Sequence, residues 1–157
     1  MNEKKVIFLD IDGVLNGALY VPETDRPGVL IDGTRLELIG HIVKETGAGI
    51  VLSTTWKNHW SKNDAECDDT GREIIRIFAE KGLTIFDKTP KYTRDRKREI
   101  TDWLGAHPEV TGFVVIDDSP FEEDILIDHF VLTSGLRRGI DEDDAEKAIA
   151  ILNGTKE

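Results

Sequence analysis

The sequence predicts a doubly wound, three-layer α/β domain built on a parallel five-stranded sheet. Three observations predict this fold class. Short apolar runs rich in Val, Ile and Phe alternate with segments of helical periodicity. The runs show no regular polar alternation, which is typical of parallel strands covered by helices on both faces. The chain has 157 residues, a length that suits one domain over residues 1–157 with a substantial core.

Five apolar runs are expected to form the strands of this sheet. The first of them ends in Asp10 and Asp12, two carboxylates separated by one residue and followed by Gly13. A buried strand does not tolerate unpaired carboxylates, so this pair is expected where the strand emerges from the core. The predicted strands cover residues 5–9, 49–52, 83–86, 113–116 and 130–132.

Four helices are expected between and after these strands. Two of them open with the spacing of a capping box, at residues 34–37 and 70–73, in which two side chains satisfy free backbone amides at the helix start. Gly47 and Gly82 can end these helices in a left-handed conformation. The third helix begins at Asp95 or a neighbour, and the fourth covers residues 145–152.

Two connecting segments lack such periodicity. Residues 16–33 contain several turn formers and are expected to form a loop or a small flap. Residues 57–69 are polar and irregular.

Composition narrows the classes of function. The formal net charge of −11 argues against broad, nonspecific binding of nucleic acid, which depends on neutralising phosphates. Positive charge is nevertheless concentrated over residues 88–98, which leaves room for a local basic groove. Cys67 is the single cysteine, so neither an intramolecular disulfide nor a cysteine metal cluster is expected. The chain has no apolar stretch of membrane-spanning length and no signal-peptide pattern, so a cytoplasmic protein without membrane contact is expected.

The residues of chemical interest share one property: they follow the ends of predicted strands. The carboxyl ends of parallel strands lie along one edge of a sheet, and ligands of doubly wound folds bind there. Residues far apart in the sequence are therefore expected to meet in space. They are Asp10, Asp12, Ser53, Asp117 and Asp118.

This pattern resembles the haloacid dehalogenase (HAD) superfamily, most of whose members are phosphatases and phosphotransferases with a Rossmann-like fold. The first motif of that family stands here as residues 10–13, and the second matches Ser53. The third, a basic residue near a helix start, matches the cluster 96–98, and the fourth matches the acidic pair 117–118. The first motif also looks like that of phosphatase domains in nucleic-acid repair proteins. Residues 116–120 are similar to a motif of capless phosphoprotein phosphatases, which usually have Asn in place of the second acid.

The resemblance implies a role for each catalytic position. Asp10 would be the nucleophile that forms an aspartyl-phosphate, and Asp12 would act first as general acid and then as general base. A hydrogen bond from Ser53 and a cation at Arg96 or Lys97 would stabilise the phosphoryl oxygens. The expected substrate-binding residues are Ser53, Thr54 and Lys57.

The resemblance also implies a bound Mg²⁺, which would relieve the repulsion between a carboxylate and a phosphate dianion. The predicted metal site uses Asp10, the backbone carbonyl of Asp12, and one acid of the pair 117–118. Asp118 is favoured as the direct ligand, with Asp117 orienting it.

Each motif also has a purely structural interpretation when it is taken alone. The Asp-x-Asp-Gly pattern is common in turns, and the acidic pair could cap a helix near Ser119. Arg96, Lys97 and Arg98 could form a solvated helix face, and only one of them needs to point inward. The combination of four motifs, rather than any one of them, therefore supports the prediction of chemistry.

Many members of that family carry a large cap domain, inserted between the first strand and its following helix or between the second and third motifs. Here residues 16–33 leave room for a flap only, and residues 57–91 are largely taken up by a loop, a helix and the third strand. The resemblance therefore implies a minimally capped enzyme with an open site. Such a site suits phosphate groups on a large substrate, such as a nucleic-acid end. A phosphoprotein or a small phosphorylated metabolite is the alternative, with a partner chain as lid in the latter case. A non-enzymatic phosphoacceptor of the response-regulator type, or a phosphate-binding module without catalysis, is the alternative of another class. The sequence predicts no oligomeric state.

Overall fold

The computed structural model describes residues 4–16, 31–91, 95–119, 128–134 and 139–154. Its strands form one parallel sheet in the order β3-β2-β1-β4-β5, which confirms the predicted fold class. The strands are β1 (Lys4–Leu9), β2 (Gly49–Leu52), β3 (Ile85–Lys88), β4 (Val110–Asp117) and β5 (Phe130–Leu132).

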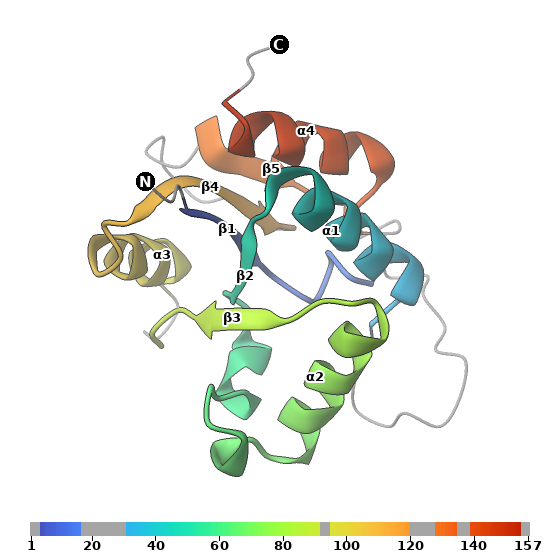
Figure 1. The fold of residues 1–157 in the computed structure, drawn as a ribbon, viewed down its shortest axis with the longest axis vertical. Coiled ribbons are helices and arrows are strands. Elements are labelled where there is room, and N and C mark those ends of the chain that lie inside the picture. Colours follow the sequence, from blue (N-terminus) through green and yellow to red (C-terminus); the bar gives the residue numbers. More distant parts are fainter. Residues whose placement is uncertain (1–3, 17–30, 92–94, 120–127, 135–138, 155–157) are drawn as a thin grey trace.

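Helices cover both faces of the sheet, as Figure 1 shows. On one face α1 (Gly33–Thr46), α2 (Asp69–Glu80) and α4 (Glu142–Leu152) contribute to the larger core cluster. On the other face α3 (Arg96–Gly105) supplies Ile100 and Trp103 to a smaller cluster. Strand residues divide between the clusters with a period of two, because successive side chains of a strand point to opposite faces.

Strand β1 lies in the middle of the sheet, which explains why its end carries the site. Leu9, its last residue, pairs with Leu52 of β2 and with Ile116 of β4. The residues that follow these strand ends are thereby brought side by side. Backbone hydrogen bonds continue this pairing past the strand, from Asp10 N to Ile116 O at 3.1 Å and from Ser53 N to Leu9 O at 3.0 Å.

The helix starts differ from the predicted capping boxes. Asp32 caps α1 and accepts a hydrogen bond from Thr34 N, and Asp68 caps α2 and accepts one from Gly71 N. An aspartate two residues ahead of each predicted threonine is the N-cap, since its short carboxylate reaches the free amides of the first turn. A capping box does occur at α4, between Asp141 and Asp144.

Other segments differ from their predicted bounds or fall outside the described residues. The segment predicted as irregular overlaps the short 3₁₀ helix η1 (Thr55–His59) and contains a second one, η2 (Asp64–Glu66). Strand β3 lies two residues later than predicted, and β4 begins earlier and includes Asp117. The flap predicted over residues 16–33 falls largely on residues 17–30, which lie outside the described residues.

Candidate active site

A tight turn after β1 carries the first two acids. Asp10 is 4% exposed, and its Oδ1 accepts a hydrogen bond from the backbone N of Ile11 at 2.9 Å. Gly13 has φ of 81°, a left-handed conformation that glycine adopts without strain. Its N–H donates to Asn16 Oδ1 at 3.0 Å, and its carbonyl accepts from Thr133 Oγ1 at 2.8 Å. These contacts fix the backbone that presents the acids.

Three carboxylates converge at this edge of the sheet. Asp10, Asp117 and Asp118 each offer an oxygen, and these oxygens lie within 4.8 Å of one another. Gly13 makes the approach of Asp118 possible, because a Cβ at residue 13 would lie 2.0 Å from Asp118 Oδ2. Convergent carboxylate oxygens are the donors that hard divalent cations prefer. The donor set therefore suits a hard divalent cation, a class that includes Mg²⁺.

The same crowding changes the protonation of these acids. Burial raises the pKa of Asp10 from its ordinary value of 3.8 to about 7, and the charge of Asp117 contributes to this rise, whereas Arg96 acts in the opposite direction. Burial, and then the charge of Asp117, also raises the pKa of Asp118. Negative charge is thus disfavoured here until a cation or a positive side chain compensates it.

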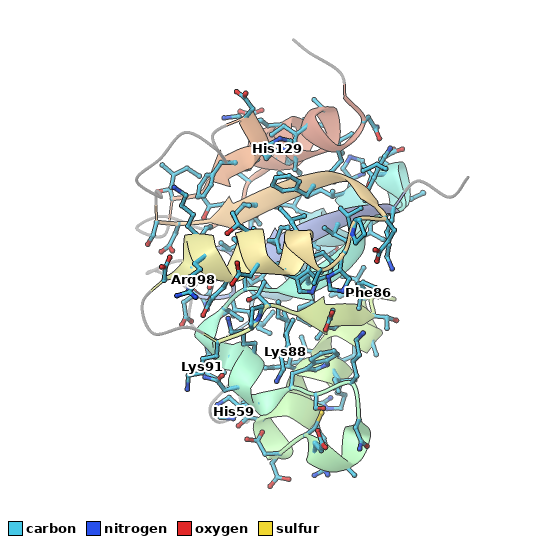
Figure 2. All side chains as sticks on the ribbon, turned by 90° about the vertical axis from the view of Figure 1, so that its left-hand side faces the viewer. His59, Phe86, Lys88, Lys91, Arg98 and His129 are labelled. Carbon is cyan, nitrogen blue, oxygen red and sulfur yellow. The ribbon has the colours of Figure 1, made fainter. Side chains whose placement is uncertain are left out.

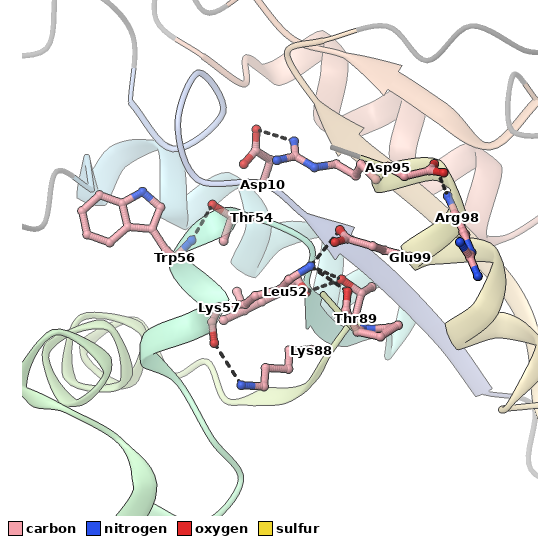
Figure 3. Close-up of polar contacts among 12 residues, drawn as sticks. Asp10, Leu52, Thr54, Trp56, Lys57, Lys88, Thr89, Asp95, Arg98 and Glu99 are labelled. Atoms are coloured by element: carbon pink, nitrogen blue, oxygen red, sulfur yellow. Dashed lines mark hydrogen bonds and ion pairs between the residues drawn. The ribbon is translucent and has the colours of Figure 1, made fainter. Parts of the chain in front are cut away.

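Arg96 supplies such a positive charge from the first residue of α3, directly after the N-cap Asp95. Its Nη1 lies 2.6 Å from Asp117 Oδ2 and 3.4 Å from Asp10 Oδ2, and Figure 3 shows the contact at Asp10. Among the ion pairs of the described residues, Arg96 is the member of the basic cluster 96–98 that reaches these acids. Lys97 is half-buried, and Arg98 Nε lies 3.7 Å from Asp102 Oδ2.

Ser53 brings an unusual hydroxyl to the site. The residue is 1% exposed, and within the described residues its Oγ has no hydrogen-bond partner. Buried polar atoms without partners are uncommon in native proteins and indicate either strain or a missing ligand. The hydroxyl follows β2 directly beside the end of β1, so it is available to an oxygen atom bound at this edge.

Thr54 and Lys57, the other predicted substrate-binding residues, make internal contacts. Thr54 is 1% exposed and caps η1, where its Oγ1 accepts from Trp56 N at 3.3 Å. Lys57 Nζ donates to Thr89 Oγ1 and to Glu99 Oε1, both at 2.8 Å, and to Pro90 O at 3.0 Å. Figure 3 shows this network below Asp10. Contact of Thr54 or Lys57 with a substrate stays a prediction.

Asp12 is arranged differently from the other acids. Its side chain is exposed and lies outside the convergent trio. Its Oδ2 accepts a hydrogen bond from the indole Nε1 of Trp56 at 3.0 Å. The carboxyl of Asp12 is therefore held at the rim of the site by a residue of η1.

Comparison with known proteins agrees with this geometry. Residues 6–145 match the family described as the HAD domain in Swiss Army Knife RNA repair proteins. The chain belongs to this HAD family. Searches of curated proteins and of solved structures found no match. The resemblance inferred from the four motifs is thereby confirmed.

Membership in the HAD family gives the site a broad chemical class. HAD domains are usually hydrolases, most often phosphatases, and they typically use Mg²⁺. The acidic trio of this HAD domain is a donor set that could hold the ion. Among the described residues, no helix is long and apolar enough to cross a membrane.

Two contacts of this HAD domain have no counterpart among the sequence-based predictions. One is the bond between Trp56 and Asp12, although Trp56 follows the second motif closely. The other is the pairing of Lys57 with Glu99, a buried acid of α3. The type of a side chain next to a motif does not reveal its partner, because the partner depends on where the side chain points in the folded chain.

Proposed function

We propose that this protein is a Mg²⁺-dependent phosphomonoesterase that forms an aspartyl-phosphate on Asp10. The observation that carries the proposal is the meeting of three groups at one end of the sheet. They are the buried carboxylate of Asp10, the guanidinium of Arg96, and the buried Ser53 hydroxyl that has no partner among the described residues. A transferring phosphoryl group needs a nucleophile and several donors for its oxygens, and these groups supply both.

The proposed reaction has two steps. An oxygen of Asp10 attacks phosphorus, and the ester P–O bond breaks while Asp12 gives a proton to the leaving oxygen. Asp12 then takes a proton from a water molecule, which attacks the phosphorus of the aspartyl-phosphate and releases inorganic phosphate and free Asp10. In both steps Ser53 and Arg96 donate to the phosphoryl oxygens and offset their charge.

Asp10, the backbone carbonyl of Asp12 and Asp118 would hold the metal ion. When bound, Mg²⁺ supplies positive charge that reduces the repulsion between the Asp10 carboxylate and a phosphate dianion. Asp117 is better suited to orientation than to direct ligation. Its Oδ2 accepts from Arg96 at 2.6 Å, and its Oδ1 accepts from Ser119 N at 3.0 Å. These contacts support Asp118 as the ligand.

We infer that the substrate carries its phosphate on the end of a nucleic acid. The family description, an RNA repair protein, supports this class. Lys91 and Arg98 are exposed and lie toward the same side of the molecule in Figure 2. Both side chains could contact backbone phosphates of a nucleic acid whose terminal phosphate is bound in the site. The net charge of −11 limits such binding to a local surface. We also infer one open domain over residues 1–157, which would admit a large substrate.

A phosphate-release assay with Mg²⁺ tests the proposal. The panel contains 5′- and 3′-phosphorylated oligonucleotides, mononucleotides, phosphopeptides, sugar phosphates and p-nitrophenyl phosphate. We expect turnover of the oligonucleotides and of the aryl phosphate, and its loss with EDTA. If only phosphopeptides or only sugar phosphates are hydrolysed, the proposed nucleic-acid substrate is wrong and that other class is the substrate. Mg²⁺ binding without release from any ester would contradict a phosphatase and favour a binding module.

A further inference from the structure

We propose that Trp56 is a positioning residue that holds the carboxyl of Asp12 in place for proton transfer to the leaving group. The inference rests on the proposed function, since it concerns the acid of that reaction. Its basis is a contact: the indole Nε1 donates to Asp12 Oδ2 at 3.0 Å. It assigns a role to a residue that stands outside the four HAD motifs.

Asp12 needs such a partner because its side chain is exposed. Asp10 and Asp117 are buried among other groups, whereas the carboxyl of Asp12 stands at the rim of the site. An exposed aspartate samples several rotamers, and a general acid works only when its proton lies within hydrogen-bond reach of the leaving oxygen. A rigid indole that donates to one carboxyl oxygen leaves the other oxygen free to carry the proton.

Trp56 is itself fixed from two sides. Its backbone N donates to Thr54 Oγ1 at 3.3 Å, at the start of η1, which Figure 3 shows. Its indole ring lies 6.0 Å from the ring of His59, measured between centroids. His59 in turn contacts Asp68, the N-cap of α2, at 2.6 Å between Nδ1 and Oδ2. The orientation of Asp12 is therefore linked to the start of α2.

The approach of α2 to η1 depends on a glycine. A Cβ at Gly71 would lie 1.9 Å from the backbone oxygen of His59. The first turn of α2 thus packs directly on the backbone of η1. This close packing supports a role for Trp56 in fixing geometry, because the element that carries it has a rigid support.

The inference predicts an effect that depends on the leaving group. An alkoxide is a poor leaving group and needs the proton of the general acid, whereas p-nitrophenolate leaves readily without it. Loss of the indole N–H should therefore impair hydrolysis of an alkyl phosphate much more than that of p-nitrophenyl phosphate. The comparison uses kcat/KM, which reports the steps up to and including phosphoenzyme formation.

The test is the W56F variant, assayed with p-nitrophenyl phosphate and with a 5′-phosphorylated oligonucleotide. We expect kcat/KM for the oligonucleotide to fall about 10- to 100-fold, as for a catalytic group that is slightly misplaced, with little change for the aryl ester. In the D12N background, W56F should lower kcat/KM little further, because the group that Trp56 positions is then unable to donate a proton.

Trp103 provides the matched control. Its indole Nε1 also donates to a carboxylate, Asp87 Oδ2 at 2.9 Å, but that carboxylate belongs to β3 and not to the site. W103F removes an equivalent bond and should change kcat/KM for both esters by the same factor. If the wild type hydrolyses both esters and W56F changes kcat/KM by the same factor for both, or changes it for neither, the inference is wrong and the proposed function stands. Inactivity of the wild type on both esters would overturn the proposed function as well.

Discussion

Ser53 makes the sharpest prediction at the scale of single residues. Its buried hydroxyl has no partner among the described residues, so it contributes little to folding and is available to phosphate. S53A should therefore lower kcat on p-nitrophenyl phosphate by roughly 100-fold, as expected for loss of one donor to a charged oxygen. The same change should leave the free energy of unfolding unchanged or higher, because a buried group without a partner is removed. Phosphate release and urea denaturation measure the two effects.

Thr54 is the matched comparison for the stability part of this prediction. Like Ser53, Thr54 is 1% exposed, but its hydroxyl caps η1. T54A should lower the free energy of unfolding by about 1 kcal/mol, the usual effect of a lost N-cap. A loss of stability in S53A as large as that in T54A, with kcat unchanged, would show that Ser53 has a structural role only.

The buried pair of Lys57 and Glu99 makes a prediction at the scale of elements. It joins η1 to α3, and Lys57 also binds Thr89 and Pro90 after β3. Because Lys57 is 4% exposed and Glu99 6% exposed, K57M leaves a buried carboxylate without this partner. We expect the free energy of unfolding to fall by about 3 to 5 kcal/mol in urea denaturation.

The double variant K57M/E99L separates pairing from packing. It removes both charges and should recover much of the lost stability, because apolar side chains of similar volume often replace a buried ion pair without loss. A K57M protein as stable as the wild type would contradict a structural role for the pair. Since Glu99 lies in the first turn of α3, which begins at Arg96, the pair also fixes the helix start that bears the site cation.

The elements themselves can largely be predicted from the sequence. Unbroken apolar runs predict the strands and their parallel arrangement, and the polar residues that follow residues 9, 52 and 116 indicate one shared edge. The helix starts are harder to predict because several residues ahead of each helix could cap it, and Asp32 and Asp68 do so. Side-chain contacts such as that between Trp56 and Asp12 depend on the folded geometry, and periodicity carries no information about them.

At the scale of the whole molecule, the three carboxylates at one end of the sheet predict how the stability of the fold depends on pH. The pKa of Asp10 rises from 3.8 to about 7 on folding, so within this range the folded protein keeps a proton that the unfolded chain releases. The contribution of Asp10 to the free energy of unfolding therefore falls as pH rises through that range. The wild type should lose stability relative to D10N between about pH 4 and pH 7 when both are free of metal. Thermal unfolding in EDTA measures this difference.

Magnesium should counteract this loss of stability at higher pH, because it binds the ionised carboxylates and competes with the proton. We expect the rise in Tm on addition of Mg²⁺ to be larger at about pH 8 than at about pH 5.5, and smaller in D10N than in the wild type at both values. A rise in Tm that is the same at the two pH values would contradict a metal site built on Asp10.

The claim that Asp10 is the nucleophile of a phosphatase is tested most directly by phosphate release from wild type and D10N, side by side, with Mg²⁺ and a 5′-phosphorylated oligonucleotide. The amide of the D10N variant keeps the shape of the side chain and an oxygen for the N–H of Ile11, so the variant should fold, as circular dichroism can verify. We predict steady release by the wild type and none above background by D10N. Release by folded D10N at the rate of the wild type would contradict the account.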